Sequence, residues 1–123
     1  MQPEERDAAY LWDMLDAARA VREFVSFRTY DDYQKDRMLR GAVERHIEII
    51  GEAARHVSAE LKQAYPEIPW RAMIGQRNIL AHEYGEVRHE MIWNVATMRI
   101  PDLIAAIRSI LVEKENHEPR DDA

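Results

Sequence analysis

The segment RNILAHEYGEV, residues 77–87, gathers side chains that can act on a phosphodiester. Arg77 carries a planar guanidinium that stays charged and suits a phosphate through its fork of N–H donors. His82 supplies an imidazole, a group whose unperturbed pKa is about 6.5 and which can give or take a proton near neutrality. In a helix, Asn78 lies one turn before His82, so its amide can reach the imidazole and fix its tautomer. Tyr84 lies nearly two turns after Arg77, on a common face if the helix persists.

Such a cluster is sufficient for RNA cleavage by transesterification. The ribose 2′-OH is then the nucleophile, and the protein supplies proton transfer and stabilises the charge of the phosphorane. This chemistry requires no metal and no cofactor. It does require both a base and an acid, whereas the cluster holds a single histidine in each chain. A two-fold homodimer that brings two copies of Arg77 and His82 to one cleft supplies both roles, so we couple activity to dimerisation.

The cluster and the other histidines also allow structural interpretations. Arginine and histidine near a helix C-terminus are also what the helix dipole favours, so the cluster alone does not prove catalysis. His82, Glu83 and His89 do not form a zinc motif, because HExxH requires the second histidine four residues after the first. His46 lies on an apolar helix stripe, and we expect a packed or interface histidine there.

Helical periodicity runs through nearly the whole chain and predicts an all-α protein. A first helix is expected from about Glu4 to Phe27, followed by a turn at TYDDY, where Thr29, Asp31 and Asp32 can cap the next helix. A long second helix is predicted from Tyr33 to Tyr65. Its stripe is unbroken: Leu39, Val43, Ile47, Ile50, Ala54, Val57, Leu61 and Ala64. Two glycines inside this helix, Gly41 and Gly51, indicate close approach by another backbone.

Prolines divide the second half of the chain. YPEIPW ends the second helix, and Pro69 suits the start of a third helix from Trp70 to about His82. Gly85 can end that helix in the left-handed conformation. A fourth helix is expected from about Val87 to Glu113, bent at Pro101. Its apolar set is Met91, Ile92, Val95, Met98, Leu103, Ile104, Ile107 and Leu111.

Composition limits the class of protein. We expect one helical domain over residues 1–113 and a polar C-terminal tail over residues 114–123. The chain has no cysteine, which fits a reducing cytoplasm. It shows neither a signal peptide nor an apolar run long enough to span a membrane. The formal net charge of −6 argues against tight nonspecific RNA binding, so any contact must be local. Candidate basic residues are Arg37, Arg40, Arg45, Arg71 and Arg77.

The motif and its surroundings resemble the HEPN superfamily, in particular the HepT-like toxins of bacterial toxin-antitoxin pairs. RNILAHEY is similar to the family signature R-x-x-x-x-H-x-Y, AVERHIEIIGEAA to its long second helix, and IWNVATMRIPDLIAAI to its last helix. The similarity covers most of residues 8–111. It implies an antiparallel bundle of four to five helices, a homodimer with the motifs at a shared cleft, and endoribonuclease activity.

The resemblance also implies roles for individual residues. Arg77 and His82 correspond to the ribonuclease residues, Asn78 to a polar neighbour, and Tyr84 to the motif tyrosine. The usual partner in the family is a small nucleotidyltransferase antitoxin that transfers AMP onto that tyrosine. Glu52, in the family-like IGEA, is a candidate to hold Arg77 from behind. One alternative remains open: a noncatalytic helical dimer that uses the same signature to bind a nucleotidyltransferase or a nucleotide.

Overall fold

Helices make up the regular structure of the protein. The computed structural model describes residues 3–82 and 89–117, and these contain no strand, which confirms the all-α class. In chain order the elements are α1 (Pro3–Val25), α2 (Tyr30–Lys35), α3 (Arg37–His56), α4 (Ala59–Ala64), α5 (Trp70–His82), α6 (His89–Asn94), the π-helical turn η1 (Val95–Arg99) and α7 (Ile100–His117).

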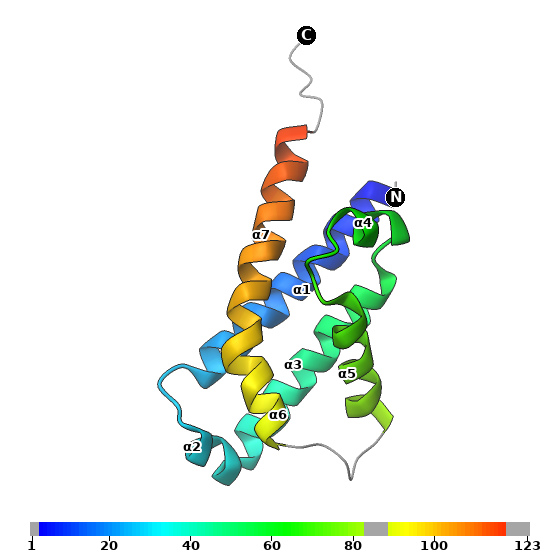
Figure 1. Ribbon diagram of the computed structural model, residues 1–123. Coiled ribbons are helices and arrows are strands. Elements are labelled where there is room, and N and C mark those ends of the chain that lie inside the picture. Colours follow the sequence, from blue (N-terminus) through cyan, green and yellow to red (C-terminus); the bar gives the residue numbers. More distant parts are fainter. Residues whose placement is uncertain (1–2, 83–88, 118–123) are drawn as a thin grey trace.

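Four long helices form the bundle. α1 packs between α3 and α7, and α3 packs in turn against α5 on its other side. α1 runs antiparallel to α3, and α5 runs antiparallel to α3 (Figure 1). The core lies where these helices meet and includes Leu11, Met14, Leu15, Val21, Val43, Ile47, Ile50, Ile92, Ile104 and Ile107. The first helix, expected from about Glu4 to Phe27, corresponds to α1 and contributes Leu11, Met14, Leu15 and Val21 to this core.

The predicted second helix, Tyr33–Tyr65, was wrong in its continuity, because the structure divides that range among α2, α3 and α4. Asp36 has an extended backbone and accepts a hydrogen bond from the Leu39 N–H, so it ends α2 and caps α3. Ser58 does the same for α4 by accepting from the Leu61 N–H at 3.2 Å. The long helix of the prediction corresponds to the 20-residue α3.

The turn before α2 is the one that TYDDY predicted. The Asp32 N–H donates to Thr29 Oγ1 at 3.1 Å, and the Thr29 N–H donates to Asp32 Oδ2 at 2.9 Å. This reciprocal pair is a capping box, which satisfies two N–H groups at the start of the helix.

Ser58 also connects two distant parts of the chain. Its N–H and its hydroxyl donate to the two oxygens of the Asp7 carboxylate at 2.8 and 2.6 Å. Asp7 is a buried charged residue in α1, and this double contact satisfies its carboxylate. The start of α4 is thereby fixed to the N-terminal part of α1.

α5 begins and ends where the sequence predicted, at Trp70 and His82. Gly51 of α3 allows this helix to lie unusually close. A Cβ atom at Gly51 would stand 2.3 Å from the Arg77 Cβ and 2.6 Å from the Met73 carbonyl oxygen. Gly41 has no such neighbour within 4 Å among the described residues, so the expected close approach is correct for Gly51 and wrong for Gly41.

The predicted fourth helix is interrupted by a wider turn. Ile100 donates its N–H to the Val95 carbonyl, five residues back, and η1 ends two residues before Pro101. Pro101 has no N–H to donate to the Thr97 carbonyl, and the helix is irregular here in the form of the π turn η1. Met98, expected in the apolar set, is 68% exposed because it lies on this turn. α7 continues to His117, beyond the expected end at Glu113. No described helix has the length and apolar character required to cross a membrane.

Candidate functional site

Arg77 lies on α5 and points its guanidinium at α3. Its Nε is 2.8 Å from Glu52 Oε2, and its Nη1 donates to Asn78 Oδ1 at 3.0 Å. Both atoms of the Glu52 contact are shielded from solvent, and the contact is an ion pair rather than a directed hydrogen bond. A guanidinium has five N–H donors. Among the described residues, Glu52 and Asn78 each occupy one of these donors. Three donors therefore remain for a ligand.

Glu52 also connects Arg77 to the imidazole of His56. Its other oxygen, Oε1, accepts a hydrogen bond of 3.1 Å from His56 Nε2, one turn further along α3. An ionised carboxylate can only accept, so the His56 proton lies on Nε2 in this arrangement. The His56 hydrogen bond, with help from Arg77, holds the pKa of Glu52 below its usual range, although burial acts in the opposite direction. Glu52 therefore stays ionised beside Arg77 at neutral pH.

The back of this chain of contacts is supported by α1. The Tyr10 ring stacks on the His56 imidazole, with ring centroids 5.3 Å apart and an angle of 22° between the planes. Stacking restricts the rotation of the imidazole, and the imidazole in turn restricts the carboxylate. Residues from α1, α3 and α5 thus fix the position of one guanidinium.

These residues line an open groove of about 580 Å³, which we call the Arg77 groove. It lies along α1, α3 and α5 and also contains Asp13, Asp16, Arg45, His46 and Glu48. Its acidic side chains outnumber its arginines, since Asp13, Asp16, Glu48 and Glu52 face Arg45 and Arg77. Arg77 therefore lies at the edge of an acidic surface.

The structure brings together some of the residues that the sequence singled out. Arg77, Asn78 and Glu52 are in contact, and α5 carries Arg77 and the backbone of His82 on one helix. The His82 side chain and Tyr84 lie outside the described residues, as do Glu83 and Gly85. The expected contact between Asn78 and the His82 ring therefore stays a prediction.

The structure adds one histidine that the sequence did not single out and confirms the interpretation of another. His56 had no recognisable constellation, yet it contacts both Glu52 and Tyr10. Its spacing of four from Glu52 was the available signal. His46 is half-buried: its Nδ1 donates to the Ala42 carbonyl at 2.8 Å and its ring meets Phe24 edge-on. The interpretation of His46 as a packed histidine is confirmed.

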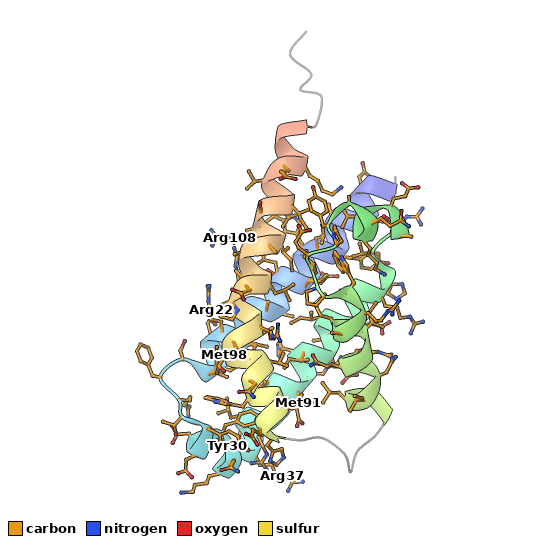
Figure 2. The ribbon with its side chains drawn as sticks, viewed as in Figure 1. Arg22, Tyr30, Arg37, Met91, Met98 and Arg108 are labelled. Carbon is orange, nitrogen blue, oxygen red and sulfur yellow. The ribbon has the colours of Figure 1, made fainter. Side chains whose placement is uncertain are left out.

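A groove of about 1050 Å³, larger than the Arg77 groove, lies elsewhere on the described residues. It lies between α5 and the α6–η1–α7 segment and is mainly apolar, with Met91 and Met98 at its rim (Figure 2). Arg77, Asn78 and Glu52 are not among its lining residues. This apolar groove and the Arg77 groove share no lining residue.

The fold and the site define a class of protein: an antiparallel all-α bundle of HEPN type, with an arginine held by a carboxylate between two helices. The family model described as ribonuclease HepT-like matches residues 14–110. The chain belongs to this family of ribonucleases, and the resemblance seen in the signature segment is confirmed.

Individual relatives agree with the family match. A protein of Methanocaldococcus jannaschii named as a candidate RNase is 36% identical over 95 residues, covering 77% of this chain and 87% of the relative. A probable ribonuclease HepT of Thermococcus cleftensis is 36% identical over 94 residues, covering 76% and 86%. A candidate RNase of Caldanaerobacter subterraneus is 32% identical over 106 residues, covering 86% and 95%. No solved structure matches the chain.

Proposed function

We propose that this chain is a metal-independent endoribonuclease that acts in the cytoplasm as the toxin of a type VII-like toxin-antitoxin pair. The observation that carries the proposal is the position of the Arg77 guanidinium. Glu52 holds it at 2.8 Å and Asn78 at 3.0 Å, and donors are left for a phosphate. A preorganised cation costs little reorganisation when negative charge develops on the phosphorane.

The reaction we propose is transesterification within the RNA. The bond between the 2′-oxygen and phosphorus forms, and the bond between phosphorus and the 5′-oxygen breaks. One His82 accepts the proton of the 2′-OH, and a protonated His82 gives a proton to the departing 5′-oxygen. The products are a 2′,3′-cyclic phosphate and a 5′-hydroxyl. Because each chain carries one His82, we assign the acid and the base to the two protomers of a homodimer.

Control of this activity is assigned to Tyr84. A nucleotidyltransferase antitoxin transfers AMP from ATP to the Tyr84 oxygen, with release of pyrophosphate. Each added AMP brings negative charge and bulk to the position seven residues after Arg77. The modified chain then repels an RNA phosphate from the site.

The test is cleavage of total RNA at neutral pH with EDTA present, using protein verified by mass as unmodified at Tyr84. We expect cleavage by the wild type and loss of it in His82→Ala and Arg77→Gln. Arg71→Gln is the matched control, since Arg71 is an exposed arginine on the same helix and lies outside the Arg77 groove. The new ends must carry 2′,3′-cyclic phosphates. If the wild type leaves the RNA intact, a noncatalytic binding module replaces the enzyme.

A further inference from the structure

A second, smaller groove adjoins the Arg77 groove on α3. It has a volume of about 430 Å³ and we call it the Arg37 groove. Its lining residues are Arg37, Arg40, Gly41, Glu44, Arg45, Glu48, Leu80 and His89. Arg45 and Glu48 line both grooves, so the two form one continuous surface along the helix.

The two grooves differ in charge. The Arg77 groove is lined by four carboxylates, two arginines and two histidines, whereas the Arg37 groove is lined by two carboxylates, three arginines and one histidine. An RNA strand carries one negative charge per nucleotide, and its affinity for a protein comes largely from neutralised phosphates. A strand that reaches Arg77 is therefore repelled on the side of Asp13 and Asp16 and attracted on the side of Arg37.

The arginines of this groove keep their positive charge available. Arg40 is held by the backbone carbonyls of Tyr33 and Gln34, which are neutral acceptors. Arg37 is exposed on the first turn of α3. Arg45 is 64% exposed and reaches Glu48 at 3.3 Å, the type of surface pair that contributes little and exchanges readily.

Glu44 is one of the two carboxylates that line this groove. Glu44 is half-buried, and Arg40 and His89 both face it. Burial raises the pKa of Glu44, and Arg40 and His89 only partly reverse this. Arg40, which stays charged at any working pH, lies close enough to Glu44 to offset part of its repulsion of a phosphate.

The direction of α5 leads from one groove to the other. α5 runs antiparallel to α3, Arg77 faces Glu52 near the end of α3, and Leu80 lies in the Arg37 groove (Figure 1). α5 continues in this direction to His82. Arg37 and Arg45 are eight residues apart, roughly 12 Å along the helix axis. That length exceeds the spacing of about 3.4 Å between stacked nucleotides, so more than one phosphate fits.

We propose that Arg37, Arg40 and Arg45 form a phosphate-binding subsite for the RNA strand next to the cleaved bond. This inference rests on the proposed ribonuclease function and adds the path of the substrate: the strand leaves the site along the N-terminal half of α3. The subsite contacts only the sugar-phosphate backbone, so it contributes affinity without base preference.

The test measures binding separately from cleavage. In a His82→Ala background, fluorescence anisotropy follows a labelled single-stranded RNA of about 20 nucleotides between about 50 and 200 mM salt. The double variant Arg37→Gln/Arg45→Gln loses two phosphate contacts. For single strands this lowers the slope of log affinity against log salt by roughly 1.4. The affinity ratio of parent to variant then grows about sevenfold between the highest and the lowest salt.

The matched control is Arg22→Gln/Arg108→Gln, which removes the same charge from the α1 and α7 edge of the molecule. Figure 2 shows Arg22 and Arg108 at the left edge of the bundle and Arg37 near its lower end. Neither control arginine lines the two grooves. We expect the control slope to equal that of the parent. The single variant Arg37→Gln, at an exposed position, provides the half-sized effect of roughly 0.7 if the double variant fails to fold.

Each outcome separates the subsite from the enzyme. If the parent binds RNA and the Arg37/Arg45 variant has the same slope as the Arg22/Arg108 control, the subsite is wrong while the ribonuclease proposal stands. If the parent binds no RNA and the wild type cleaves none, both proposals fall together. A reduced slope in the groove variant alone supports the subsite.

Discussion

Replacing Gly51 with alanine tests whether the close approach of α3 and α5 fixes Arg77. The new Cβ would stand 2.3 Å from the Arg77 Cβ and 2.6 Å from the Met73 carbonyl oxygen. Carbon atoms in ordinary contact lie about 3.5–4.0 Å apart, so α5 must retreat by about 1 Å or more. The carbonyl oxygen belongs to the backbone and cannot rotate away. Overpacking of this type costs about 1–3 kcal/mol.

Helix propensity favours alanine over glycine, so its contribution to stability has to be separated from that of the clash. Alanine in place of a mid-helix glycine gains about 0.5–1 kcal/mol in either position. Gly41→Ala on the same helix has this gain without the clash, since no atom of the described residues lies within 4 Å of its Cβ. The difference between the two variants, about 1–3 kcal/mol, therefore isolates the packing of α5 on α3.

The assay is urea unfolding followed by circular dichroism, at one fixed protein concentration and with equal m values for the variants. We expect Gly41→Ala to unfold at higher urea than the wild type and Gly51→Ala at lower urea. A displacement of Arg77 by about 1 Å can cost roughly a hundredfold in rate, so Gly51→Ala also loses RNA cleavage. Equal midpoints for the two alanine variants refute the reasoning.

The other predictions concern the groups behind Arg77 and those at the start of α4. Glu52→Gln removes the charge that holds Arg77, and we expect a loss of roughly tenfold or more in kcat with KM little changed; a change confined to KM contradicts this. The pKa of Glu52 is lowered in the folded protein, so its stabilising contribution is present above its unfolded pKa and is lost as the pH falls through its folded value. The stability difference between wild type and Glu52→Gln must then narrow in acid, which urea titrations across pH can measure. Ser58→Ala removes the hydroxyl donor to Asp7 and the cap of α4, while the backbone N–H at this position still donates to Asp7. The unfolding free energy should fall by about 1–3 kcal/mol while cleavage persists, and an unchanged midpoint argues against the hydroxyl contact.

The sequence predicted the helical faces well because burial repeats with the helix period. The start of α5 at Trp70 followed from Pro69. The break at Ser58 was missed because Val57 and Leu61 continue the apolar stripe across it, and the break at Asp36 lies in the same way between buried Tyr33 and Leu39. Periodicity reports which face is buried, and a helix that bends onto the same core keeps the pattern.

The candidate site was predicted in part, and distance along the chain explains the rest. Arg77 and Asn78 are neighbours in sequence, and Glu52 was suggested by its family-like segment. His56 was not recognised because its stacking partner, Tyr10, lies 46 residues earlier, on another helix. A contact between distant residues leaves no spacing in the sequence from which to predict it.

The π turn η1 has a consequence for which changes in length this chain tolerates. Buried Ile92, Ala96 and Ile100 are spaced by four, whereas an α-helix has about 3.6 residues per turn, so two such steps would drift about 80° off the core in a regular helix. The wider turn absorbs that drift and returns α7 to the core in the correct rotation. Deleting one residue between Val95 and Arg99 would place Ile92 and Ile100 seven residues apart, and a regular helix brings such a pair to within about 20° of the same face. A relative that is one residue shorter here should therefore have a regular helix without the π turn and keep the same face of α7 on the core.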